Sequence, residues 1–303
     1  MRSTTPDHVT ALVEDLASPA ASRSEIRKEL TIFGVVQLLL TVLTTVVGLQ
    51  QGIDVQHLED GPPLGVTALL LMALWPTVAA LVARRTVHGR IRWSGWGLRR
   101  TTLRRLGAAW AVILLTVLAS GVVLWATELG GLDLASDPVA PVLGLTVMVL
   151  PFLVLALGEE LGWRGLVVTR LAQVSRPRTV VLATGIAWSA GHFQLLVLFG
   201  GTPEGVPTLY AIVMFTIALT ALGAILASMQ LHWGIWPACV AHAVWNATLY
   251  NVVEPVTVDG SVTTWFSTET GALLAASSVV TAVLWWRRYP LRRTPDGVTA
   301  VGG

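Results

Sequence analysis

The stretch "LGAAWAVILLTVLASGVVLWA", residues 106–126, contains no charged side chain. A helix needs about 20 mostly apolar residues to cross a hydrocarbon core of about 30 Å, so this stretch predicts a transmembrane helix. Similar apolar runs lie on both sides of it, at 31–49, 64–83, 139–157, 179–199, 207–228, 233–250 and 270–286. Together the runs predict an all-α, polytopic membrane protein with about eight transmembrane helices.

The composition of the whole chain supports this fold class. Of its 303 residues, 53% are hydrophobic and only 13% are charged. A soluble domain of this size needs more charge to cover its surface. Cys239 is the single cysteine, which excludes an internal disulfide and a cysteine-based metal cluster.

The basic residues predict the orientation. With eight spans, 19 of the 20 Lys and Arg residues fall on one face, and the loops on the other face carry only acids. Because basic loops stay in the cytosol, we expect a multi-pass protein of the plasma membrane with both termini cytosolic. The arginines lie in short loops beside anionic lipid, so the lipid bilayer is the expected partner and nucleic acid is not.

The chain divides into one membrane domain and two tails. Residues 1–29 are expected to form a cytosolic tail with an interfacial helix that begins at Ser24. The membrane domain covers 30–287, with its motifs concentrated in 139–250. Residues 288–303 are expected to form a cytosolic C-terminal tail.

A few strongly polar side chains remain inside the predicted spans. A charge near the bilayer centre costs a few kcal/mol, so such groups usually face a cavity or a partner. These residues are Glu159, Glu160, Arg164, His192, His242 and Asn246. The remaining histidines are expected to be solvated: His8, His57, His88 and His232.

The spacing of these residues assigns them different roles. Glu160 and Arg164 are four residues apart and can pair on one helix face. Glu159 points elsewhere and is left as a free carboxylate. His242 and Asn246 are also four apart, and Trp188 precedes His192 by one turn.

Two kinds of chemistry fit this set. A carboxylate with a histidine can hold and deprotonate a water molecule, while a histidine and an asparagine can donate hydrogen bonds to an oxyanion. Alternatively, Glu159, His192 and His242 could coordinate a divalent metal, zinc above all, that activates the water. Taken singly, the Glu160–Arg164 pair is more often a structural ion pair and Asn246 more often an interhelical hydrogen bond, while a lone histidine is as often structural as functional. Their concentration on successive helices favours one polar cavity.

The sequence resembles the CAAX-protease and bacteriocin-processing family of intramembrane proteases. The family pattern EExxxR, then F/WxxxH, then HxxxN/D matches "EELGWR" (159–164), "WSAGH" (188–192) and "HAVWN" (242–246). Trp188 stands where phenylalanine is commoner in the family. The chain lacks HExxH, GxSG and GxGD, the motifs of other intramembrane protease classes.

The resemblance implies an intramembrane endopeptidase of metalloprotease or glutamate protease type. Glu159 would activate the water with His192, and His242 with Asn246 would stabilise the oxyanion. Glu160, Arg164 and Trp188 would orient these groups. The substrate would be a membrane protein or peptide, cut in its C-terminal or juxtamembrane segment. The alternative is a non-catalytic binding, transport or immunity protein that uses the same cavity.

Overall fold

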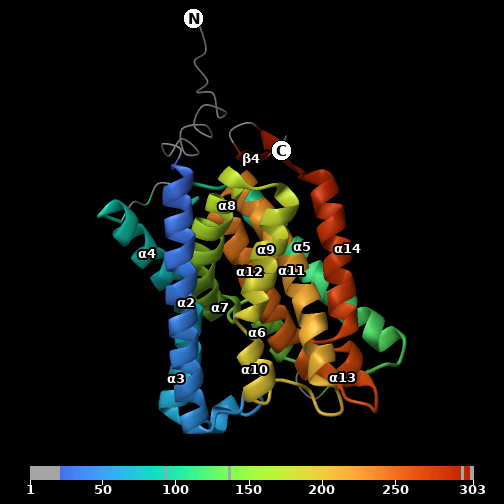
Figure 1. The fold of residues 1–303 in the computed structure, drawn as a ribbon. Helices are drawn as coiled ribbons and strands as arrows, with labels where there is room; N and C mark the ends of the chain where they lie inside the picture. Colours follow the sequence, from blue (N-terminus) through green and yellow to red (C-terminus); the bar gives the residue numbers. More distant parts are fainter. Residues whose placement is uncertain (1–20, 92, 94, 136–137, 295–296, 301–303) are drawn as a thin grey trace, which may run out of the picture.

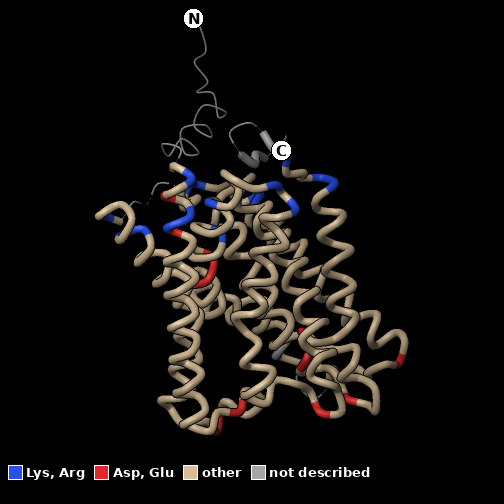
Figure 2. Tube along the Cα trace, viewed as in Figure 1, with Lys and Arg blue, Asp and Glu red and all other residues tan. Residues whose placement is uncertain are grey.

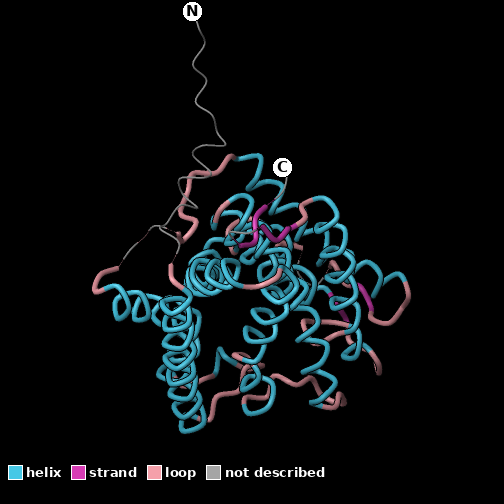
Figure 3. Tube along the Cα trace, turned by 45° about the horizontal axis from the view of Figure 1, so that its top comes forward, coloured by secondary structure: helices cyan, strands magenta, loops and turns pink. Residues whose placement is uncertain are grey.

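The computed structural model describes residues 21–91, 93, 95–135, 138–294 and 297–300. The predicted tail over 1–20, His8 within it, and the end of the C-terminal tail at 301–303 lie outside these residues. The described chain is a bundle of helices with two short pairs of strands (Figure 1, Figure 3). The predicted all-α membrane fold is therefore confirmed.

Five helical segments of the described chain are long and apolar enough to cross a membrane. They are Arg23–Gln51, Pro63–His88, Leu103–Ala126, Pro177–Leu198 and Thr208–Trp233. The other three predicted ranges are also helical, but their helices are shorter or broken. The count of eight spans therefore stays a prediction.

The first two predicted spans form one edge of the bundle (Figure 1). Helix α2 (Arg23–Gln51) begins earlier than the predicted span, because Ser22 and Glu25 form a capping box at its start. The expected interfacial helix capped by Ser24 is thus the first turns of α2. The second span is built from α3 (Pro63–Leu71), η2 (Met72–Leu74) and α4 (Trp75–His88). It packs along α2, where Trp75 Nε1 donates to Thr44 Oγ1 at 2.8 Å.

The motif-bearing helices lie in the middle of the bundle. The predicted span 139–157 is divided into α6 (Ala140–Leu145) and α7 (Val149–Glu160). The helix then continues without a break through the π-helical segment η3 (Leu161–Val168) into α8 (Thr169–Val174). The next predicted span is α9 (Pro177–Ala190), followed by α10 (Phe193–Leu198).

Three further long helices complete the core. They are α5 (Leu103–Ala126), α11 (Thr208–Trp233) and α12 (Ile235–Thr248). Between α11 and α12 the chain turns at Gly234, whose φ of 92° is easily adopted only by glycine. Helix α12 packs between α5 and α7, so that His242 enters the bundle interior.

The remaining elements lie at the two ends of the bundle. After α12 come η4 (Leu249–Val253) and η5 (Glu254–Val256), then α13 (Thr263–Phe266) and α14 (Ala272–Arg288). The loop after α2 holds η1 (Leu58–Asp60). Strands β1 (Gly131–Leu132) and β2 (Thr257–Val258) pair antiparallel. Strands β3 (Leu291–Thr294) and β4 (Gly297–Ala300) form a second antiparallel pair within the predicted C-terminal tail.

Charge is segregated along the bundle. Lys and Arg gather at the end where α2 begins and α14 ends, and acids dominate the opposite end (Figure 2). This matches the segregation of charge predicted from the sequence.

A buried carboxylate joins α2, α4 and α8 near the basic end. Glu29 is fully buried and accepts from Arg170. Its Oε1 also lies 2.7 Å from His88 Nε2 and 3.4 Å from Arg84 Nε. The expectation that His88 is solvated is therefore wrong, because helix α4 continues beyond the predicted span and carries this residue inward.

The other described histidines outside the site differ among themselves. His232 is also buried, with Nδ1 2.9 Å from the Ser228 carbonyl oxygen, so its solvated assignment was wrong as well. His57 agrees with the prediction, since its side chain is 64% exposed beside Asp54.

Candidate active site

The adjacent acids at the end of α7 face different surroundings. Glu160 is fully buried, and its Oε1 accepts from Arg164 Nη1 at 2.9 Å. His242 Nδ1, on α12, lies 3.0 Å from the same oxygen. Because a carboxylate accepts, this nitrogen of His242 carries a proton. One carboxylate thus ties η3 to α12, and removing either partner would leave the buried charge of Glu160 with less compensation.

Glu159 turns instead towards α9. Its Oε2 accepts a hydrogen bond of 2.6 Å from Trp188 Nε1 and lies 3.9 Å from His192 Nε2. The side chains of Glu159 and His192 are 13% and 23% exposed, so both can be reached from the space around them. Of the two acids, Glu159 is the one available to a small molecule.

The tautomer of neutral His192 follows from its backbone contact. Its Nδ1 lies 2.9 Å from the carbonyl oxygen of Trp188. A carbonyl oxygen only accepts, so Nδ1 must donate, which leaves a lone pair on Nε2 of the neutral ring. Two acceptors, Glu159 Oε2 and His192 Nε2, therefore face each other across 3.9 Å.

Trp188 contacts residues of both groups, the one around Glu159 and the one around Glu160. The Arg164 guanidinium lies over its ring, 4.1 Å from the centroid. The ring meets His242 edge to face at a centroid distance of 5.2 Å and His192 at 6.2 Å. Trp188 therefore holds Arg164 and both histidines around one rigid indole while its N–H binds Glu159.

A small cavity adjoins Glu159 and His192. Its volume of ≈ 30 Å³ is enough for a water molecule. One wall holds Glu159, Trp163, Trp188, Gly191 and His192, and the other holds Gln37, Met72, Ala73 and Pro76.

Gln37 brings an unpaired acceptor to this cavity. Its Oε1 is buried and has no hydrogen-bond partner among the described residues. Its Nε2 makes only a long contact, 3.4 Å, with Thr41 on the same helix. A buried amide oxygen of this kind can receive a donor from a bound molecule.

The local sequence explains why these helices approach so closely. A side chain at Gly162 would overlap Pro76 of α4, and one at Gly158 would lie 2.5 Å from the carbonyl oxygen of Ala73. Thr77 Oγ1 donates to the Gly158 carbonyl at 2.5 Å across the same contact. The glycines therefore bring the wall that carries Gln37 next to Glu159. The π-helical turn begins directly after Glu160, and π-helical turns of this kind are frequent at functional sites.

The structure brings together some of the predicted site residues and separates others. Glu159, Trp188 and His192 line the cavity. His242 lies behind Trp188 with Glu160 and Arg164. Asn246 follows His242 by one turn, is half-buried, and is not among the residues that line the cavity.

The predicted metal ligands do not converge in this arrangement. His242 Nδ1 contacts Glu160, whereas His192 is the histidine near Glu159. Among the described residues, no group of three or more His, Cys, Asp or Glu side chains is placed to hold a metal ion.

Comparison with known proteins finds a similarity over the part of the chain that carries this site. Residues 141–248 match the family described as Type II CAAX prenyl endopeptidase Rce1-like. This segment of the chain is similar to the CAAX protease family. The matched segment runs from α6 to the end of α12 and contains every residue of the three predicted motifs. No curated protein matches the chain.

The similarity of this segment to CAAX proteases agrees with a hydrolase that acts within a bilayer on a membrane-associated peptide. The match leaves out α2, η2 and α4, whose residues form the second wall of the cavity. Sequence reasoning missed Gln37 on that wall. The available signal was a lone amide within the apolar run 31–49.

Proposed function

We propose that this protein is an intramembrane protease of the CAAX type, which hydrolyses a peptide bond with a water molecule held between Glu159 and His192. The observation that carries the proposal is the pair of acceptors 3.9 Å apart beside a cavity of water size. A water donating one proton to each acceptor keeps its oxygen lone pairs free for attack. The Trp188 N–H holds Glu159 in place for this contact.

The reaction then proceeds through a tetrahedral intermediate. Glu159 takes a proton from the water as the oxygen bonds to the carbonyl carbon of the peptide. The carbon–nitrogen bond breaks when Glu159 returns this proton to the leaving nitrogen. The products are a carboxylic acid and an amine, and the enzyme is restored.

His242 and Asn246 would stabilise the oxyanion of that intermediate. Because Nδ1 of His242 donates to Glu160, the ring can donate through Nε2 only when both nitrogens carry protons. A donor at this position would stabilise the negative charge of the oxyanion as it develops. Asn246 would add a neutral amide donor one helical turn away.

Gln37 would bind the backbone of the substrate. Its buried Oε1 is an acceptor, and an extended peptide offers N–H donors at regular intervals. An N–H next to the scissile bond would pair with Gln37 while the carbonyl faces Glu159. The substrate would be the C-terminal or juxtamembrane segment of a membrane protein or peptide.

The same proposal includes a location and an orientation. The charge segregation supports a plasma-membrane protein with both termini in the cytosol. Reporter fusions at the two termini and in the acidic loops test this orientation. Reporters in the acidic loops that are active on the cytosolic side would overturn it.

The function itself is tested in cells. Membrane proteomes from cells with wild-type protein and with Glu159→Gln are compared for uncut C-terminal tails, and Glu204→Gln serves as an exposed control. Uncut tails that accumulate only with Glu159→Gln support the proposal. Identical proteomes at equal protein levels would contradict it.

A further inference from the structure

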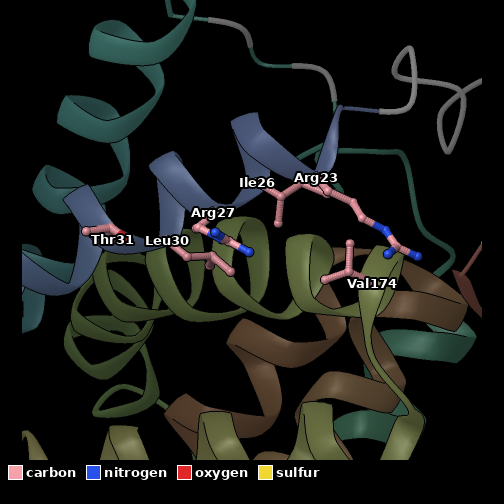
Figure 4. A pocket seen from close by; sticks show the side chains of 6 residues that line it. All are labelled: Arg23, Ile26, Arg27, Leu30, Thr31 and Val174. Carbon is pink, nitrogen blue, oxygen red and sulfur yellow. The ribbon is translucent and has the colours of Figure 1, made fainter.

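A second hollow lies between α2 and α8 at the basic end of the bundle (Figure 4). Its volume is ≈ 620 Å³, and it is lined by Arg23, Ile26, Arg27, Leu30, Thr31 and Val174. Arg23 and Arg27 are four residues apart on α2, so they share one face of the helix. Both side chains extend along the side of the hollow that faces α8 (Figure 4).

The acids of α2 are engaged elsewhere. Glu25 accepts from the backbone N–H of Ser22 at 2.8 Å in the capping box. Glu29 is buried and shared by Arg84, His88 and Arg170. Among the described residues, no acid pairs with Arg23 or Arg27, which leaves two positive charges at this hollow.

The floor between the two arginines is apolar. Ile26 is buried there, and Leu30 and Val174 line the hollow beside it. Farther along α2 the exposed side chains are apolar, including Leu38, Leu39 and Val42. The positive charges of the two arginines thus lie next to an apolar surface along α2. A ligand that fits both carries an anionic group next to hydrocarbon chains.

We propose that the hollow binds the headgroup of an anionic phospholipid. The phosphate would lie between the Arg23 and Arg27 guanidinium groups, which suit bidentate phosphate binding. The acyl chains would follow the exposed apolar face of α2. The site is separate from the Glu159 cavity, so this proposal does not depend on the proposed chemistry.

Native mass spectrometry of the full-length protein in detergent tests the proposal. Phosphatidylglycerol and phosphatidylcholine are titrated onto wild-type protein and onto Arg23→Gln/Arg27→Gln. The control is Arg104→Gln/Arg287→Gln, which removes two charges outside the hollow. Inorganic phosphate is added in a separate competition arm.

We expect wild-type protein to prefer phosphatidylglycerol, and the Arg23/Arg27 variant to bind its first equivalent roughly tenfold more weakly. The control variant should retain wild-type binding. Equal losses in both variants, or no preference for the anionic lipid, would overturn the proposal. Displacement of the lipid by millimolar inorganic phosphate would also overturn it, since the hollow would then be a site for free phosphate.

Discussion

Trp188 donates a hydrogen bond of 2.6 Å from Nε1 to Oε2 of Glu159. This contact joins the second motif of the site directly to the first. Phenylalanine, the commoner residue of the family pattern at this position, has no such donor. Tryptophan in place of phenylalanine at position 188 therefore adds a hydrogen bond to the proposed base, in addition to ring packing.

Trp188→Phe should lower kcat by about tenfold, because a hydrogen bond to a charged group is lost. The phenyl ring can still pack against Arg164 and the two histidines, so the melting temperature should change little. Trp265→Phe, near Tyr210, is the matched control. An unchanged kcat would show that the indole serves packing alone.

Gln37→Leu should raise KM more than it lowers kcat, because Gln37 is proposed to bind substrate and to take no part in proton transfer. We expect a change in KM of about tenfold for one lost hydrogen bond to a bound peptide. Gln50→Leu lies on the exposed part of the same helix and should have wild-type kinetics. A fall in kcat with constant KM would assign Gln37 to the chemical step instead.

Stability should depend on pH through Glu254, the first residue of η5. Burial, with Glu269 and Asp259 adding to it, raises the pKa of Glu254 from its ordinary value of 4.5 to about 8. Between these values the unfolded chain loses a proton that the folded chain keeps. This loss favours unfolding increasingly as the pH rises.

Glu254→Gln should therefore be more stable than wild type at about pH 8 and nearly equal to it at about pH 5. Thermal unfolding of the purified protein at both pH values measures this difference. Glu204→Gln, at an exposed acid of another loop, should follow the wild-type curve. A Glu254→Gln variant whose stability relative to wild type is the same at both pH values would rule out the raised pKa.

Chelation of divalent metals should leave peptide hydrolysis within about twofold of the untreated enzyme, because the three candidate ligands do not converge. Activity and metal content of the purified protein are measured before and after chelation. Loss of activity that returns with added zinc would mean that His242 leaves Glu160 to join Glu159 and His192 around a metal.

The sequence predicted the fold class and the spacing-dependent contacts well, because both depend on local pattern. Long uncharged runs become helices in a bilayer, and the four-residue spacing of Glu160 and Arg164 places them within reach of each other. Helix ends were predicted less well. Side-chain capping by Ser22 and the continuous α7–η3–α8 helix extend helices beyond the apolar runs.

Contacts between distant helices could not be predicted from spacing. The pairing of His242 with Glu160 depends on how α12 rotates against α7. The burial of Glu29 by Arg170 depends on packing between residues far apart in the chain. The position of Gln37 near Glu159 is likewise a contact between distant helices, since it requires the close approach at Gly158 and Gly162.

The central claim is that Glu159 is the base that activates water. Its most direct test is the hydrolysis rate of purified, folded Glu159→Gln on a membrane-anchored peptide that the wild-type enzyme cuts. We expect a fall in kcat of roughly 10²- to 10⁴-fold, with retained stability and substrate binding. Wild-type turnover by that variant would contradict it.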